Sequence, residues 1–137
     1  MTTITTITPT VTDISGDGTA YKITWAHLLY VEFVADPPQA EVQYAGIALA
    51  KPEFVDRSIQ VLGTFGGGTV VIEGSVDGTN YKTLTDPQGN ALSVTAAKIE
   101  AVSELVSLIR PRTTAGAIGV TDLTVALIVR RPQPLRT

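Results

Sequence analysis

One stretch, TFGGGTVVIEGSVDGTNYKTL between Thr64 and Leu84, constrains the fold of this chain more than any other. From Val70 to Val76 small or apolar residues recur at every second position, so one face of a strand can be buried. The pair Asp77-Gly78 then reverses the chain, because glycine tolerates the positive φ of a tight turn. The stretch holds no cluster of catalytic or metal-binding residues. It predicts a β-sheet structural or binding protein rather than an enzyme.

The length of 137 residues fits one domain, residues 1–137, and a domain of this size buries about 68% of the surface of its unfolded chain. With no cysteine, the chain has neither disulfides nor thiolate metal sites, which suits a reducing compartment. Residues 1–12 lack the basic and apolar regions of a secretory signal, and no apolar run approaches the ~20 residues that span a bilayer. We therefore expect synthesis in the cytoplasm of the host cell and no membrane insertion.

The charges are unevenly distributed. Residues 1–50 carry five acids and one base, a balance of −4, while residues 105–137 carry five arginines and only Asp122, a balance of +4. This polarity can attract a neighbouring subunit or a charged lattice, although exposed charges beyond about 10 Å are screened at 0.1 M salt. Scattered solvating charges are the equal alternative. Five arginines without interleaved aromatic residues do not predict nucleic-acid binding.

Alternation and turn residues predict several further elements. Ala40 to Glu53 has no clear period and is interpreted as a long loop or arm. Residues 96–104 hold helix formers, with Ile99 and Val102 three apart, and predict one or two helical turns. The expected strands are Tyr21–Trp25, Tyr30–Ala35, Ser58–Phe65, Leu92–Thr95, Leu105–Arg110 (ended by Pro111) and Leu123–Arg130.

These elements predict an all-β fold, an antiparallel two-sheet β-sandwich of jelly-roll or immunoglobulin-like type. One short helix near residues 96–104 and extended termini complete it. Residues 1–12, which alternate threonine with isoleucine or valine around Pro9, are expected to be an N-terminal arm or edge strand, and residues 132–137 a C-terminal tail.

Residues that carry chemistry are few. His27 is the single histidine, so a zinc site or a Cys-His pair has no partner set, and no serine lies in a Gly-x-Ser-x-Gly turn. The run from Gly66 to Gly68 lacks the Lys-Ser/Thr pair and the helix of a phosphate-binding loop and is interpreted as a hairpin turn. We predict no catalytic residue, no cofactor and no metal.

Two other residue types leave alternatives. The aspartates at expected turns, Asp17, Asp77, Asp86 and Asp122, are favoured as turn residues over calcium ligands. Trp25 and Tyr21 share a strand face and are favoured as core residues over a platform for sugars. Tyr44, in the irregular segment, is the better contact candidate.

The block GTVVIEGSVDGTNYKTLTDPQGNALSVTAAKIEAV, followed by SLIRPRTTAG and DLTVALIVRR, resembles a group of small virion proteins of tailed phages. In that group a Gly-Thr-Val strand leads to Gly-Ser-x-Asp-Gly-Thr-Asn-aromatic, then to Thr-Asp-Pro-Gln-Gly-Asn-Ala, an Ile-Arg-Pro strand and a terminal Leu-Thr-Val strand. Tyr81 holds the aromatic position here, and the resemblance covers roughly residues 58–131. Proteins of this type are head decoration, or cement, proteins: β-sandwiches on the outside of a capsid.

The resemblance implies a virion structural protein that binds the outer capsid surface, stabilises contacts between major capsid protein subunits and has no active site. A homo-oligomer, a dimer or a trimer, is expected because closed symmetry dominates self-assembly. The alternative is a carbohydrate-binding adhesion module, because residues 75–81 also resemble a hairpin of discoidin-like sandwiches. The expected partner-contact residues are Ile4, Ile7, Val11, Tyr44, Ile47, Leu49, Arg130, Arg131 and Leu135.

Overall fold

The computed structural model describes residues 2–16, 18–33, 40–46, 49–50, 56–104, 106–116 and 120–130, and among them the chain forms strands and no helix. Side chains are described within residues 6–16, 18–30, 56–104, 106–116 and 120–130. The strands are β1 (Thr2–Ile7), β2 (Thr10–Asp13), β3 (Ala20–Phe33), β4 (Ala40–Gly46), β5 (Leu49–Ala50), β6 (Asp56–Thr64), β7 (Thr69–Ser75), β8 (Lys82–Thr83), β9 (Ser93–Val94), β10 (Lys98–Ala101), β11 (Leu108–Ala115) and β12 (Asp122–Arg130).

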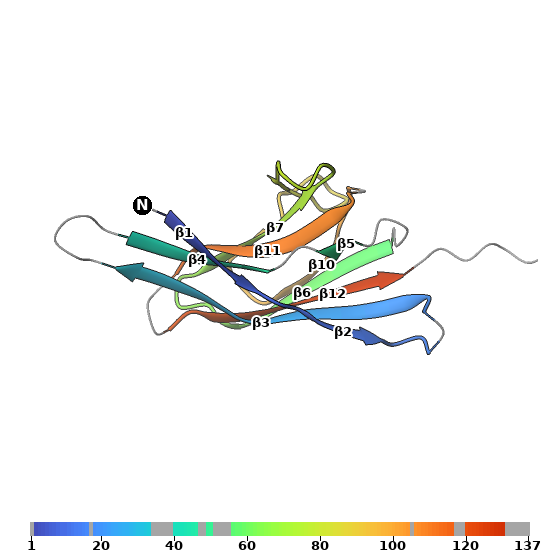
Figure 1. The fold of residues 1–137 in the computed structure, drawn as a ribbon, viewed down its shortest axis with the longest axis horizontal. Helices are drawn as coiled ribbons and strands as arrows, with labels where there is room; N and C mark the ends of the chain where they lie inside the picture. Colours follow the sequence, from blue (N-terminus) through green and yellow to red (C-terminus); the bar gives the residue numbers. More distant parts are fainter. Residues whose placement is uncertain are drawn as a thin grey trace, which may run out of the picture.

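The strands form two sheets, which Figure 1 shows as an upper and a lower layer. Sheet A contains β4, β11 and β7, with β1, β5, β8 and β9 at its edges, and sheet B contains β10, β6, β12, β3 and β2. Each described pair is antiparallel except β1 with β4, which is parallel. The all-β prediction is confirmed and a two-sheet sandwich is consistent with this order, from which neither the jelly-roll nor the immunoglobulin-like type follows.

Strand β3 belongs to both sheets. Its first part pairs with β12 and its last residues, Tyr30 to Phe33, pair with β4. Within the part that pairs with β12, Ala26 and His27 lie opposite Thr124, and His27 has a φ of 59°, the left-handed conformation of a β-bulge. A bulge bends a strand, so one continuous strand replaces the two that we predicted at Tyr21–Trp25 and Tyr30–Ala35.

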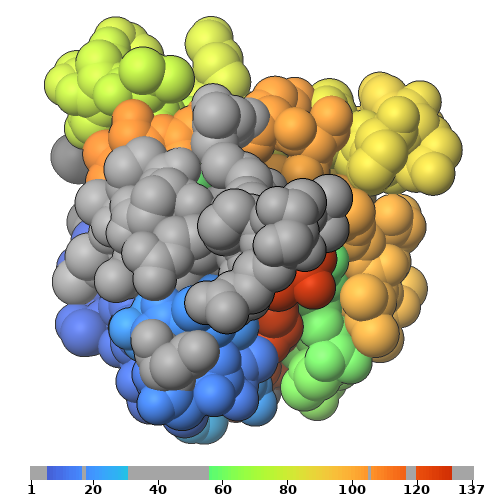
Figure 2. Space-filling view, turned by 90° about the vertical axis from the view of Figure 1, so that its right-hand side faces the viewer, coloured from blue at the N-terminus to red at the C-terminus, as the bar shows by residue number. Residues whose placement is uncertain are grey.

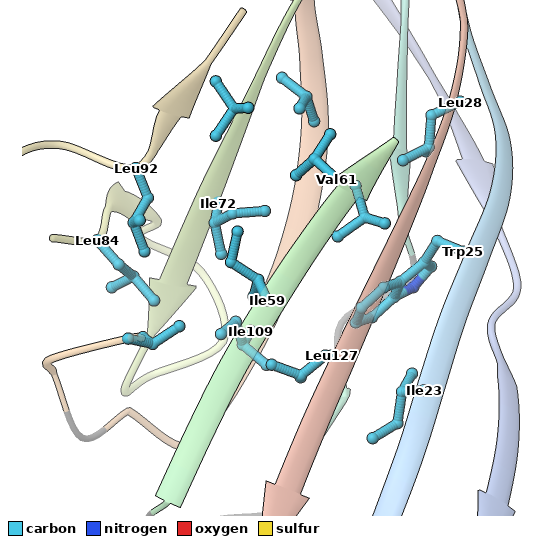
Figure 3. Packing of buried hydrophobic residues seen from close by; sticks show 14 of the residues in the cluster. Ile23, Trp25, Leu28, Ile59, Val61, Ile72, Leu84, Leu92, Ile109 and Leu127 are labelled. Atoms are coloured by element: carbon cyan, nitrogen blue, oxygen red, sulfur yellow. The ribbon is translucent and has the colours of Figure 1, made fainter. Parts of the chain in front are cut away.

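The core fills the space between the layers (Figure 3). Strands β6 and β12 alternate buried and more exposed residues, so that Leu123, Val125, Leu127 and Val129 all point inward. From sheet A, Ile72 and its neighbours pack against them. Full burial of such a side chain contributes about 1.5–3 kcal/mol, so this continuous cluster is the main source of stability.

Pro111 lies inside β11, so the prediction that it ends the strand is wrong. On the β7 side the pairing continues from Leu108 to Thr113. On the other side β5 pairs with Leu108 and Ile109 and β4 pairs with Arg112. On that side Pro111 lies between the residues that pair with β5 and the residue that pairs with β4. Its missing amide hydrogen therefore interrupts no described pair with either strand.

The predicted helix near residues 96–104 is also wrong. Residues Lys98 to Ala101 form β10, which pairs with Val61 to Ser58 of β6. Ile99 is 67% exposed and only Val102 is buried, so the two residues do not share one buried helical face. Helix propensity is a weak preference, and the open edge of β6 offers a complete ladder instead.

The segment that we interpreted as a loop, Ala40 to Glu53, contains β4 and β5 in its described part. Strand β4 pairs with β1, β3 and β11, so neighbours from three parts of the chain stabilise its extended backbone. Its sequence AEVQYAG does alternate polar with apolar residues over a few positions, which is the signal that our interpretation missed.

Of the two alternatives for the N-terminal segment, an arm or an edge strand, the described residues form edge strands. Strand β1 pairs with β4 of sheet A and β2 pairs with β3 of sheet B, with Pro9 between them where no pairing is needed. Ile7 packs against the core. The segment therefore contacts both sheets of its own chain, and residues 132–137 lie outside the described residues.

Candidate functional site

The connection between β7 and β8, residues 75–81, is held together by one carboxylate, and we name it the Asp77 loop. Asp77 Oδ1 accepts hydrogen bonds from Ser75 Oγ at 2.9 Å and from the amides of Thr79 and Asn80 at 2.9 and 2.8 Å. Its Oδ2 accepts from Asn80 Nδ2 at 2.7 Å. A single side chain thus satisfies four donors, as expected for an aspartate that bonds to its own turn.

The glycine at position 78 and the negative charge of Asp77 both fit the geometry of the loop. Gly78 has a φ of +80° and its amide donates to Ser75 Oγ at 2.8 Å, so the turn tolerates no ordinary side chain there without strain. The amide of Asn80, then that of Thr79 and the side chains of Asn80 and Ser75, hold the pKa of Asp77 well below its ordinary value of 3.8. The loop is therefore ordered before it meets any partner.

A second loop, residues 86–90, is likewise held together by an aspartate carboxylate that accepts hydrogen bonds from its own turn. Asp86 Oδ1 accepts from the amides of Gln88 and Asn90 at 3.0 and 2.9 Å, and the amide of Gly89 donates to the Asp86 carbonyl at 2.9 Å. The Asn90 amide is the first cause that lowers the pKa of Asp86. Both loops project from the body, in lime and yellow in Figure 2. They contain two of the five motifs on which the resemblance described above is based.

An open cleft of about 540 Å³ lies beside the Asp77 loop. Val76, at its edge, is 75% exposed, which is unusual for a side chain with no polar atom. Glu104 also lines the cleft, and its carboxylate accepts hydrogen bonds from the amide and the hydroxyl of Thr85 at 2.8 and 2.6 Å. Burial raises the pKa of Glu104, but the two hydrogen bonds from Thr85 outweigh it, so that the pKa is lowered. The cleft is lined by Gly74, Ser75, Val76, Asp77, Asn80, Lys82, Thr83, Leu84, Glu104 and Val106.

A buried ion cluster supports the base of the same hairpin. Glu73 is 3% exposed and accepts from Arg110 Nε at 2.7 Å and Arg112 Nε at 3.2 Å. The guanidinium of Arg110 also lies 3.9 Å from the centre of the Tyr81 ring. Two cations thus compensate the one buried carboxylate, which fixes β7 against β11.

The predicted contact residues whose side chains the structure describes, Ile7, Val11 and Arg130, do not lie together in one site. Ile7 packs against the core, Val11 is 46% exposed on β2, and Arg130 donates to Asp56 at 2.9 Å at the end of β12. The backbones of Ile4, Tyr44 and Leu49 lie on β1, β4 and β5, and their side chains are outside the described part. Ile47, Arg131 and Leu135 lie outside the described residues.

Val76 and its cleft were missed by the sequence analysis. We assigned Val76 to the buried face of its strand, but β7 ends at Ser75 and the chain turns before the alternation reaches Val76. The signal was present: a serine two residues before an aspartate in Ser-x-Asp-Gly favours a side-chain-bonded turn that starts at the serine.

The single histidine, the first residue considered for a catalytic or metal site, contacts a carboxylate on the neighbouring strand. His27, 78% exposed, lies 3.3 Å from the carboxylate of Asp122 at the bulge. Within the described residues no group of three or more His, Asp or Glu is arranged to hold a metal ion. The described part of the chain also has no helix that is long and apolar enough to cross a bilayer.

The described aromatic residues do not form a platform. Trp25 is 1% exposed and Tyr30 8%, and Tyr21 packs partly buried against the core. This confirms the core assignment of Trp25 and Tyr21. Tyr81 faces Arg110 instead of an open surface.

The lowered pKa of Asp77 predicts an acid-sensitive loop. In the folded chain the carboxylate is favoured, so its stabilising effect is complete above the ordinary pKa of 3.8 and is lost as the pH falls through the lower folded pKa. Urea unfolding at a series of acidic pH values should show that Asp77→Asn loses less stability than the wild type below pH 3.8. Ser75→Ala, which removes one donor, should lie between them. Identical pH dependence in all three proteins would contradict this account.

Comparison with solved structures shows a structural likeness. The fold is similar to the crystal structure of SPBc2 prophage-derived protein YomS, with 11% identical residues over 80% of this chain and 93% of that chain and a TM-score of 0.49. A similarity of this degree supports no conclusion about function. No protein-family model matches the chain, and no curated protein matches its sequence.

Proposed function

We propose that this chain is a structural protein of a virion, a decoration protein that binds the outer capsid surface and stabilises contacts between major capsid protein subunits. The observation that carries the proposal is the Asp77 loop, which belongs to the motif that resembles the decoration proteins and presents the exposed side chain of Val76 beside an open cleft. A structural binder needs surfaces of this kind rather than reactive groups.

The rigidity of the loop suits attachment. The four hydrogen bonds to Asp77 hold it in one conformation, so that little conformational entropy remains to be lost on docking. The Glu73 cluster fixes the strand from which the loop projects. Weak contacts repeated over a shell then add up, because each bound copy is one of many. The exposed residues Val11 and Arg130 remain predicted contacts of the same body.

The proposal is tested on capsids assembled without the protein. Adding the wild type should give particle-bound protein in sedimentation and should raise the temperature at which the particles rupture. Val76→Glu should fold normally but bind at least tenfold more weakly, because a charge at the edge of the cleft must be desolvated.

Ile14→Glu is the matched control, because Ile14 is 51% exposed in the turn after β2, away from the Asp77 loop. It should bind as the wild type does. Failure of the wild type to bind the particles or to change their rupture temperature would overturn the proposal, and normal binding by Val76→Glu would remove the Asp77 loop from it.

A further inference from the structure

The outer face of sheet B is a continuous surface across five strands. Cross-strand partners share a face, so the pairing registers define which side chains meet there. One row runs Thr12, Lys22, Ile128, Ser58, Ala101 and the next Thr10, Thr24, Ala126, Gln60, Ile99. We name these ten residues the sheet B face.

The sheet B face is poor in charge and carries two exposed isoleucines. Ile99 and Ile128 are 67% and 37% exposed, and Leu62, further along β6, is 43% exposed. Lys22 is the single charged residue of the ten, and the ion pair of Arg130 with Asp56 lies at one end. Absence of charge from the centre of a surface patch is characteristic of the core of a protein interface.

The face has both protruding and recessed parts. Two open depressions, of about 400 and 290 Å³, share Ser58 and Ile128. The depressions are lined by the small side chains of Ser58, Ala101 and Ala126. The larger side chains of Ile99 and Ile128 lie beside these small residues. A two-fold contact needs one surface that carries both the inserting groups and the sites that receive them, and this face carries both.

The area also fits self-association. Strands β6 and β12 have nine residues each, or ~30 Å at ~3.3 Å per residue, and five strands ~4.8 Å apart span ~24 Å. Because β2 and β10 have only four residues each, the five strands cover roughly 570 Å² per copy, and two such faces bury roughly 1,100 Å², just above the ~1,000 Å² that a specific interface needs. Sheets pack in this way, ~10 Å apart, inside ordinary sandwiches.

We propose that two copies of this chain form a two-fold dimer in which the sheet B faces pack against each other. Ile99 and Ile128 of each copy enter the recesses over Ser58 and Ala126 of the other. Lys22 lies on β3, one strand from the central strand β12, and lines the smaller depression, so its long side chain has to extend outward to keep the ammonium group in water when an isoleucine enters. This dimer needs no capsid, so it stands or fails independently of the proposed function.

Sedimentation equilibrium of the full chain tests the proposal. The wild type should associate to twice the chain mass of 14.4 kDa. Ile99→Glu should raise the dissociation constant at least tenfold without loss of folding, because Ile99 is exposed in the monomer. Ile14→Glu, the same change at an exposed isoleucine off the face, should leave the constant unchanged. A wild type that stays monomeric at every concentration, or a dimer that Ile99→Glu leaves intact, would overturn the proposal.

A single introduced cysteine gives a second readout, because the chain has none of its own. Ala126→Cys, on the central strand, should give a covalent dimer with a short bis-maleimide cross-linker, which spans sheets ~10 Å apart where a disulfide cannot, whereas Ile14→Cys should not. Cross-linking through Cys at position 14 but not at 126 would place the contact elsewhere and would also overturn the proposal.

Discussion

Glu73→Ala should lower the free energy of unfolding by about 2–4 kcal/mol, one of the two largest effects of a single substitution that we expect in this chain. Its carboxylate is buried and accepts from both Arg110 and Arg112. Removing it takes a buried carboxylate away from two guanidinium groups that lie side by side. The value lies toward the lower end for a buried pair, because the two arginine side chains keep 20% and 25% exposure and regain some water. Urea unfolding followed by circular dichroism measures the change.

Glu100→Ala is the matched control for this experiment. Glu100 pairs with Lys98 at 3.5 Å, but both side chains are more exposed, and a surface pair of this kind contributes about 0–1 kcal/mol. Equal losses for the two variants would mean that burial of the Glu73 cluster has no energetic consequence, contrary to the structure.

Trp25→Ala should lower the free energy of unfolding by about 3–5 kcal/mol. The indole is 1% exposed and lies between the sheets among Ile23, Leu28 and Leu127 (Figure 3), so its removal leaves a large cavity that the neighbouring strands cannot close. Thermal and urea unfolding should both show the loss.

Trp25→Phe is the partner variant, because it keeps an aromatic ring in the same space and should recover more than half of the loss. As a control outside the core, Ile14→Ala should change stability by no more than about 0.5 kcal/mol. A small effect of Trp25→Ala would contradict the placement of this residue in the core.

Local patterns predicted the elements whose buried face is set by alternation. The strand from Leu123 to Arg130 and the hairpin after Gly68 follow this rule, and the turn at Gly66 and Gly67 uses the positive φ that only glycine adopts readily. In each case the residues that decide the structure lie next to one another in the sequence.

The errors occurred where distant parts of the chain decide the structure. Residues 98–101 have a helical preference that the free edge of β6 overrides, and β4 is extended because β1, β3 and β11 pair with it. Pro111 is tolerated because its missing donor falls between two partner strands. None of these neighbours can be read from the local sequence.

The candidate site was predicted only in outline. The pair Asp77-Gly78 predicted a turn, and residues 75–81 lie inside the block that carries the resemblance, but Val76 was assigned to the strand before the turn. The exposure of Val76 and the cleft beside it depend on where β7 stops and on how Val106 and Glu104 return to the hairpin. The sheet B face likewise became visible only once the register of five strands was known.

The bulge at His27 has a mechanical consequence. In many sandwiches the two layers are joined only by loops and by side-chain packing, so they can slip past each other under force. Here the backbone of β3 runs unbroken from one layer into the other, paired with β12 through the bulge as far as Leu29 and with β4 from Tyr30 onward. Sliding the layers would require breaking both ladders at once. A body built in this way transmits tension through covalent bonds rather than through contacts.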